Sequence, residues 1–167
     1  MQVKNKFAEQ LTLDLAGVVR RDVAQKVHIS DGQLTRLANG QRTGDKGMRS
    51  GLAHALHSIL LAFSGARKDY GVLSFLKSSK RYDDVMATLF QQRKEEDDRR
   101  ALEEAFDQAM TTKPEARSSQ QILLIRDYFK EYAEEIMSEN TDIVAKAEYA
   151  GIDIHQVFDE ANARVGG

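Results

Sequence analysis

Residues 20–42 have the sequence RRDVAQKVHISDGQLTRLANGQR, and this stretch determines the fold that we expect. Apolar residues recur at helical spacing in two short segments, Val19 to Val27 and Asp31 to Ala38, which lie on either side of a turn. Ser30 is a typical helix N-cap, and Gln33 three residues later completes the pattern of a capping box. The stretch therefore predicts two short helices joined by a tight turn, the second with a defined start.

The same three- and four-residue spacing of apolar residues continues on both sides of this stretch, and the chain contains one proline in 167 residues. Upstream we expect a helix from Phe7 to Leu15 that is closed by Gly17. Downstream, three glycines predict a loop over residues 39–47. After the loop we expect one amphipathic helix from Met48 to Phe63, and a further helix that carries Tyr70, Leu73 and Leu76.

A run of charged residues dominates the start of the second half. Over residues 91–100, four pairs of opposite charges stand four residues apart, and each such pair stabilises an isolated helix by about 0.2 to 0.5 kcal/mol. We therefore expect one long helix from about Arg81 to Met110. Because its middle lacks an apolar face, we expect that part to be exposed on all sides and to connect two packed units. A flexible charged linker is the alternative.

Pro114 ends this helix, and an amphipathic helix follows with apolar residues from Ile122 to Ile136 along one side. A short helix is expected within residues 141–153, ending at Gly151, and a last helix from about Ile154 to Val165. The fold class is therefore all-α. We expect a basic domain over residues 1–80, a connecting helix over residues 81–112 and an acidic helical module over residues 113–167.

Charge is distributed unevenly along the chain, although the formal net charge is only −2. Residues 1–81 contain 14 Lys and Arg and 6 Asp and Glu, so 14 minus 6 gives +8. Residues 82–167 contain 10 Lys and Arg and 20 Asp and Glu, which gives −10. A nucleic-acid partner fits the basic half, whereas the acidic half is more suited to face protein or solvent. Two unequal solvated surfaces are the alternative.

Residues 20–42 also have the features of a helix-turn-helix, which needs a small residue before the turn and apolar anchors at the turn and on the second helix. The residues at these places are Ala24, Ile29, Leu34 and Leu37. The stretch resembles the helix-turn-helix domains of phage repressors and of bacterial regulators of the xenobiotic-response-element class, which also share its closing residues Asn39, Gly40 and Arg42. The resemblance covers about residues 5–65. A helical packing unit without a role in DNA binding is the alternative.

One residue departs from the pattern of that family. His28 stands at the turn, where the family often has glycine. Histidine tolerates the left-handed backbone conformation better than most residues other than glycine. Histidine at this place is therefore compatible with the turn, although it departs from the pattern of the family.

The resemblance implies that the second helix of the motif enters the major groove of double-stranded DNA, with its N-terminal half against the base edges. Gln33 is suited to pair with adenine and Arg36 with guanine. The candidates for reading bases are Asp31, Gln33, Thr35 and Arg36. The candidates for contacting phosphates are Arg20, Arg21, Asn39, Gln41, Arg42, Lys46 and Arg49. Ordinary surface solvation is the alternative for each of the latter.

No pattern of catalytic or metal-binding residues stands out. The chain has no cysteine, and no nucleophile elbow, metalloprotease helix or phosphate-binding loop occurs. His54 and His57 are three residues apart, but the sequence places no third ligand. The longest apolar run, Ile59 to Phe63, is far shorter than a membrane span. We therefore expect a protein that is not an enzyme, with no metal, no cofactor and no membrane segment, located in the cytoplasm.

Together these features predict a sequence-specific DNA-binding transcriptional regulator, most plausibly a repressor of the phage or mobile-element type. Such regulators bind two half-sites as a dimer, so we expect a dimer or higher oligomer held by the C-terminal half. The candidate oligomerisation residues are Phe129, Tyr132, Ile136, Val157 and Phe158. The alternative is an adaptor that binds a replication or transcription protein, and a protein co-regulator is a further candidate partner.

Overall fold

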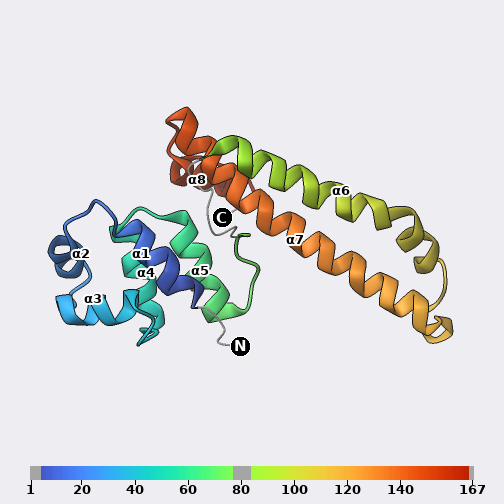
Figure 1. Cartoon of the computed structure of the whole chain (residues 1–167), viewed down its shortest axis with the longest axis horizontal. Helices are drawn as coiled ribbons and strands as arrows, with labels where there is room; N and C mark the ends of the chain where they lie inside the picture. Colours follow the sequence, from blue (N-terminus) through green and yellow to red (C-terminus); the bar gives the residue numbers. More distant parts are fainter. Residues whose placement is uncertain (1–4, 77–83, 166–167) are drawn as a thin grey trace. The chain divides into compact units, whose positions relative to one another are not determined.

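The computed structural model describes residues 5–76 and 84–165, and over these ranges it contains eight α-helices, one 3₁₀ helix and no strand (Figure 1). The expected all-α fold class is therefore confirmed. Within the described ranges, no helix combines the length and the apolar character needed to cross a membrane. The chain divides into two compact units, residues 1–74 and residues 75–167. The domain boundary expected between residues 80 and 81 lies outside the described residues.

The first unit consists of short helices, and the first three agree with the expected ones. These helices are α1 (Lys6–Asp14), α2 (Arg20–Lys26), α3 (Asp31–Ala38), α4 (Lys46–Ala55) and α5 (Ile59–Tyr70). α1 packs against α3 and α5, while α2 packs against α3 and α4. Their apolar faces meet in one core, whose most deeply buried members are Leu11, Leu34, Leu52 and Leu61.

The prediction of a single helix from Met48 to Phe63 is wrong, because the chain turns between α4 and α5. His57 at this turn has a φ of +50°, and its backbone N–H donates to the His54 carbonyl at 3.1 Å. The Ser58 hydroxyl then accepts from the Leu61 N–H at 3.1 Å and starts α5. A left-handed residue followed by a serine N-cap therefore breaks a pattern of apolar residues that is continuous in the sequence.

The helix expected to carry Tyr70, Leu73 and Leu76 is also wrong. α5 ends at Tyr70, and Gly71 after it takes the left-handed conformation with a φ of +69°. Residues 71–76 have no helical structure. Because glycine adopts this conformation without a steric penalty, it ends α5 before the last two apolar residues of the expected helix can join it.

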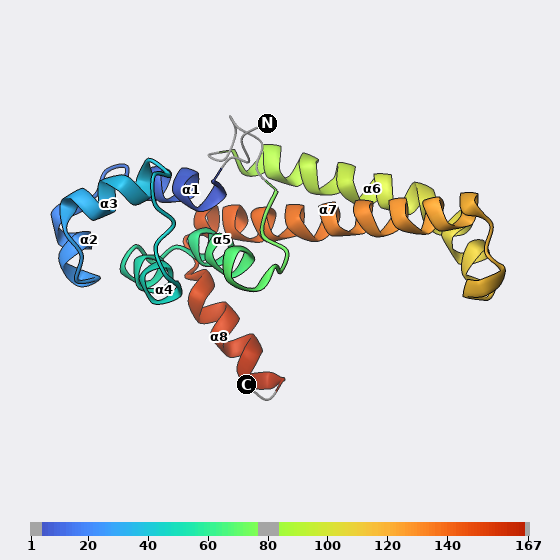
Figure 2. The ribbon, with the colours of Figure 1, turned by 90° about the horizontal axis from the view of Figure 1, so that it is seen from below.

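The second unit is built on two long helices, α6 (Val85–Met110) and α7 (Ser119–Ala150), which run antiparallel side by side (Figures 1 and 2). Between them, Pro114 begins the 3₁₀ helix Pro114–Ala116, so the expected break at this proline is confirmed. The last helix, α8 (Ile154–Arg164), turns away from the direction of α7 (Figure 2). This unit is therefore a helical hairpin with a short C-terminal extension.

The prediction that the middle of α6 is exposed on all sides and connects two packed units is wrong. α6 packs along α7 inside the second unit. Glu95 is only 3% exposed, and Arg99 forms ion pairs with Glu103 at 2.9 Å and with Glu135 of α7. The charged run thus has a buried side, because polar residues of α7 supply partners for it. The expected start at Arg81 lies outside the described residues.

The separate short helix expected within residues 141–153 is wrong as well, because α7 continues through most of this segment. The Thr141 hydroxyl donates to the Leu76 carbonyl at 2.8 Å, so the polar residue at the expected break has a partner from outside the helix. α7 ends where the sequence predicts, at Gly151, which has a φ of +68°. A tertiary contact therefore keeps the helix continuous where its sequence turns polar.

Candidate nucleic-acid interface

The turn between α2 and α3 is closed by the hydrogen bonds of a Schellman motif. His28 has a φ of +55°, and its N–H donates to the Gln25 carbonyl at 3.1 Å. The Ile29 N–H donates to the Ala24 carbonyl at 2.9 Å. In this motif one left-handed residue satisfies the last carbonyls of a helix. His28 thus takes the left-handed conformation that a glycine would take at this turn, and Ala24 is buried, as the helix-turn-helix pattern requires.

α3 is fixed at its start and along its inner side. The Ser30 hydroxyl accepts from the Gln33 N–H at 3.2 Å, and the Gln33 side-chain oxygen accepts from the Ser30 N–H at 2.9 Å. The expected capping box is thus confirmed. Leu34 and Leu37 are 0% and 2% exposed and hold the inner side of α3 in the core. The helix therefore has one anchored side and one side open to solvent.

The candidates for reading bases differ in how available their side chains are. Asp31, Thr35 and Arg36 are exposed, whereas Gln33 is half-buried. A bidentate pair with adenine needs both the oxygen and the nitrogen of the Gln33 amide, but its oxygen already accepts from Ser30. The capping bond and the expected contact with adenine therefore exclude each other. Arg36 has no such competing bond in the part of the chain that the structure describes.

Six of the seven phosphate candidates are exposed: Arg20, Arg21, Asn39, Gln41, Arg42 and Lys46. The two arginines at the start of α2 and the residues that follow α3 thus lie on the surface, where they can meet a ligand. The Lys46 ammonium lies 4.6 Å from the centre of the Tyr70 ring. The Tyr70 side chain raises the pKa of Lys46 above its ordinary value, chiefly through hydrogen bonding. Lys46 therefore carries its positive charge at the start of α4 near neutral pH.

The prediction that Arg49 contacts phosphate is wrong. Its side chain is only 9% exposed and forms an ion pair with Asp69 of α5. The same guanidinium donates to the carbonyls of Thr43 at 2.9 Å and Gly44 at 2.7 Å. Arg49 thus fixes the loop that follows α3 and ties it to α5. Its basic side chain is part of the framework of the unit and is not available to a ligand.

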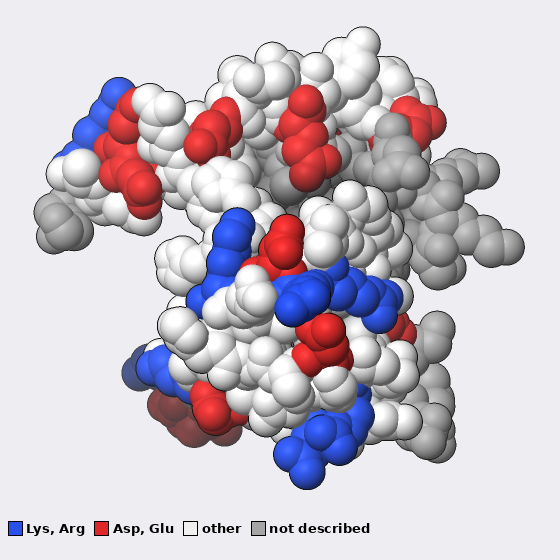
Figure 3. Space-filling model, turned by 90° about the vertical axis from the view of Figure 1, so that its left-hand side faces the viewer, with Lys and Arg blue, Asp and Glu red and all other residues white. Residues whose placement is uncertain are grey.

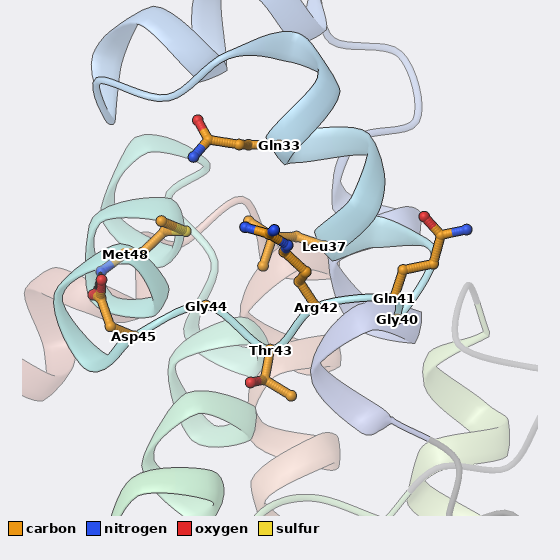
Figure 4. A pocket seen from close by; sticks show the side chains of 9 residues that line it. All are labelled: Gln33, Leu37, Gly40, Gln41, Arg42, Thr43, Gly44, Asp45 and Met48. Atoms are coloured by element: carbon orange, nitrogen blue, oxygen red, sulfur yellow. Dashed lines mark hydrogen bonds between the residues drawn. The ribbon is translucent and has the colours of Figure 1, made fainter.

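A hollow of about 480 Å³ opens between the end of α3, this loop and the start of α4 (Figure 4). Figure 4 shows the Arg42 side chain directed toward the space between Gln33 and Met48, and the Gln41 side chain directed away from it. Asp45 lies at the side, where its carboxylate accepts from the Met48 N–H at 2.8 Å and caps α4. The hollow therefore offers one guanidinium group to an anion beside the end of α3.

The first unit is less basic than the first 81 residues together. Residues 1–74 contain 11 Lys and Arg and 6 Asp and Glu, so 11 minus 6 gives +5. On the face drawn in Figure 3, Lys and Arg side chains form separate groups with Asp and Glu side chains between them. Asp31 adds a negative charge in the first turn of α3. Electrostatic attraction to a nucleic acid is therefore local and depends on few side chains.

Two side chains that hold this surface in place give no local signal in the sequence. The Thr12 hydroxyl of α1 donates to the Ala38 carbonyl at 3.0 Å, 26 residues away, and so supports the end of α3. Asp69, the partner of Arg49, lies 20 residues from it in the sequence. Both contacts are set by packing of helices and not by residue spacing within one helix.

The oligomerisation candidates lie on two helices of the second unit. Phe129, Tyr132 and Ile136 share one side of α7, and the first two are 55% and 43% exposed. Phe129 also meets the Phe106 ring edge-on, with 5.6 Å between the ring centres. The structure therefore brings these three together. The other two candidates, Val157 and Phe158, lie apart from them on α8.

Among the described residues, one acidic cluster has the spacing of metal ligands. It comprises Glu95, Asp98 and Glu131, whose carboxylate oxygens lie within 4.8 Å of one another. Lys94 lies 3.6 Å from Glu95 and 2.5 Å from Asp98 and neutralises part of this charge. The cluster is thus already held by a cation of the chain itself.

No family model, no curated protein and no solved structure matches the chain. The function of the first unit therefore has to be argued from its own geometry. That geometry is a short helix with a capped start, an anchored inner side and an open outer side, preceded by a tight turn and flanked by exposed cations.

Proposed function

We propose that the chain is a sequence-specific DNA-binding regulator and that α3 is its recognition helix. The proposal rests on one observation: the inner side of α3 is anchored in the core, while Asp31, Thr35 and Arg36 remain open to solvent. Leu34 and Leu37 fix the rotation of the helix about its axis. A helix whose outer side chains are positioned in this way can present the same pattern to every ligand it meets.

The dimensions of α3 fit the major groove. An α-helix with side chains is about 10 to 12 Å wide, and the major groove of B-form DNA is about 12 Å wide. Arg36 is suited to donate two hydrogen bonds to guanine, and Asp31 can accept one from the amino group of cytosine. The exposed side of α3 therefore has the chemistry to favour particular base pairs.

Contacts to the DNA backbone would come from the cations around α3. Arg20 and Arg21 begin α2, Arg42 points into the hollow behind the end of α3, and Lys46 begins α4. Such residues position a protein on DNA without reading its sequence. Their number is small, so a single unit of this kind is expected to bind DNA weakly.

Weak binding by one unit favours a regulator that binds as a dimer or higher oligomer. Two copies would engage two half-sites about 34 Å apart, one turn of the DNA helix. The most plausible biological role is that of a repressor of the phage or mobile-element type, as the resemblance of residues 20–42 implies. The second unit is then the part that holds the copies together.

The proposal is tested by selecting duplexes from a random pool and titrating the selected duplex against variants. Arg36→Ala is expected to cost about 1 to 3 kcal/mol and to relax the preference at one base pair. Arg42→Ala is expected to weaken binding to all duplexes alike. Arg67→Ala is the matched control, because Arg67 is an exposed arginine on α5, away from α3. Equal affinities for all three variants and the unchanged protein would overturn the assignment of α3.

One observation favours a second candidate, an adaptor that binds a replication or transcription protein through its helical surfaces. In the first unit, Asp31 stands in the first turn of α3, and the cations around α3 are few. Such mixed charge suits a protein partner better than a phosphate backbone. An adaptor would bind no duplex even at low salt.

A further inference from the structure

α7 has a continuous side without charged residues. The residues on this side, which we call the α7 stripe, follow one another at intervals of three or four, so they project from one side of the helix. They are Ile122, Ile125, Phe129, Ala133, Ile136, Asn140, Ile143 and Ala147. Ile122, Phe129 and Ile143 are 54%, 55% and 40% exposed. A run of this length is expected to be covered, because exposed apolar residues in series mark an interaction surface.

The contact between α6 and α7 does not use these residues to form a core. The most buried residues of the two helices are largely polar or charged: Thr88, Glu95, Glu135, Ser138, Thr141 and Asp142. Tyr128, which stacks on Phe106 of α6, is buried as well, whereas Ile122, Phe129 and Ile143 of the stripe remain 40–55% exposed. A hairpin of two helices has only one internal contact, and helices bury their apolar sides fully only against a further layer.

We infer that the occupant of the α7 stripe is a second copy of this chain, with the two α6–α7 hairpins packed face to face as a four-helix bundle. Area supports this occupant. α6 has 26 residues and is therefore about 39 Å long, and two helices side by side are about 20 Å wide. The hairpin face thus measures about 780 Å², close to the roughly 800 Å² per partner of a standard stable interface.

The order of residues along the stripe supports an antiparallel pairing of the two α7 helices. Its ends, Ile122 and Ala147, are equally far from the point between residues 134 and 135. A two-fold axis at that point sets Ile122 opposite Ala147 of the second copy and Ile125 opposite Val144, the neighbour of Ile143. The same axis sets Phe129 opposite Asn140 and Ala133 opposite Ile136. Each pairing joins two uncharged residues, as a self-complementary interface requires.

Charges on α6 agree with the same axis. Contacts across the hairpin place Thr88 level with Asp142 and Phe106 level with Tyr128. The point between residues 134 and 135 of α7 is therefore level with about residue 98 of α6. The axis then brings Glu96 of each copy opposite Arg100 of the other. These residues also pair within one copy, at 2.5 Å, so four alternating charges would meet at the centre of the bundle.

This inference deepens the proposed function, on which its biological purpose rests, since it names the surface that would hold two DNA-binding units together. The proposed interface is formed only by residues of the second unit. Because self-association is measured without DNA, a failure to form the dimer can be told apart from a failure to bind DNA. If the first unit binds no duplex, the dimer of hairpins is still tested by the mass of the protein in solution.

Sedimentation equilibrium of the full chain tests the occupant. We expect twice the 18.8 kDa of one chain at micromolar concentrations, and a rise in the dimer dissociation constant of about 30-fold or more for Ile122→Glu. Leu123→Glu is the matched control, because Leu123 is the next residue, is 57% exposed and lies outside the stripe. We expect it to remain dimeric. Both variants should keep the circular dichroism of the unchanged protein.

Two results would overturn the inference. One is a single-chain mass for the unchanged protein up to about 100 µM, far above the dissociation constants of standard interfaces. In that case the stripe serves a different protein. The other is a dimer that Leu123→Glu disrupts as strongly as Ile122→Glu, because the interface would then not be the stripe.

Disulfide crosslinking tests the antiparallel orientation, and the absence of native cysteine makes it specific. The double variant Phe129→Cys with Asn140→Cys is expected to form a covalent dimer under mild oxidation, because the axis sets these two partly exposed positions opposite each other. Phe129→Cys alone is expected to stay uncrosslinked, because its two copies would be about 17 Å apart along the helix axis at 1.5 Å per residue. Efficient crosslinking of the single variant would show a parallel arrangement and contradict the proposed axis.

Discussion

The two units of this chain bury different kinds of residue. In the first unit, five short helices enclose a core of leucines with Phe7, Val23 and small residues, and most of its apolar side chains are hidden. In the second unit, α6 and α7 bury carboxylates and hydroxyls between them and leave isoleucines and aromatic residues 40–55% exposed beside the contact. The first unit therefore buries most of its own apolar side chains, whereas the second leaves an apolar side that a partner can cover.

This difference separates two tasks that a DNA-binding regulator must combine. A closed core can hold a recognition helix in a fixed position, which α3 requires. An open hairpin can associate with another copy while its internal contact stays intact, because the polar residues within it already have partners. Glu135, for example, is only 6% exposed and pairs with Arg99. Burial alone would lower the pKa of Arg99, but hydrogen bonds to Glu103, Tyr128 and Glu135 outweigh it and raise that pKa, so the Arg99 guanidinium stays charged.

The largest effect is expected from substituting Arg49, which ties the loop after α3 to α5. Arg49→Ala leaves the Asp69 carboxylate and two loop carbonyls without their partner, and losing one member of a buried ion pair costs about 3 kcal/mol or more. Hydrogen exchange of the amides of α1 to α5 measures the loss. Arg67→Ala, an exposed control, should change the same free energy by less than about 0.5 kcal/mol. A loss below about 1 kcal/mol for Arg49→Ala would contradict the framework role.

A smaller effect separates the two units by their dependence on concentration. If the hairpins form a dimer, each tenfold rise in protein concentration should raise the opening free energy of the α6 and α7 amides by about 0.7 kcal/mol. A factor of ten corresponds to about 1.4 kcal/mol per dimer, and the two chains share it equally. The amides of α1 to α5 should not change. Hydrogen exchange at two protein concentrations measures the amides of both units together. Equal changes in the two units would contradict the proposed difference between them.

The smallest single effect, that of His28→Gly, concerns the turn before α3. His28→Gly relieves a left-handed residue other than glycine but increases the freedom of the unfolded chain, so a net gain of about 0.5 kcal/mol is expected. His28→Val should instead lose about 1 to 2 kcal/mol, because a β-branched residue strongly disfavours this conformation. Urea unfolding of the two variants gives the difference. Equal stabilities would show that the strain at this turn is absorbed elsewhere.

Local signals predicted much of the first unit. The capping box of Ser30 and Gln33 is a property of a few neighbouring residues, and so is the turn at His28, with which histidine is compatible; both occur in the structure. The turn at His57 uses the same device as His28, a left-handed histidine shortly before a serine N-cap. It was not predicted, because the apolar spacing runs through it without interruption.

Long-range partners account for the errors in the second unit and at Arg49. Charges four residues apart look the same whether the helix is solvated or packed, so the burial of Glu95 on α6 is not visible in the sequence. Thr141 and its partner Leu76 lie 65 residues apart, and this contact belongs to the part of α7 where a break was expected. In the sequence Arg49 resembles a surface cation, because its partner Asp69 lies 20 residues away. Base reading by α3 stays a prediction.

The central claim is that exposed cations around α3 bind the phosphate backbone of DNA, and the salt dependence of duplex binding tests it most directly. The four exposed cations Arg20, Arg21, Arg42 and Lys46, at about 0.9 per contact, predict that the logarithm of the binding constant falls with the logarithm of the salt concentration with a slope of about −3.6 per chain. A fluorescence titration of the selected duplex at several salt concentrations gives this slope. No duplex binding at about 50 mM salt, or a slope near zero, would contradict the account.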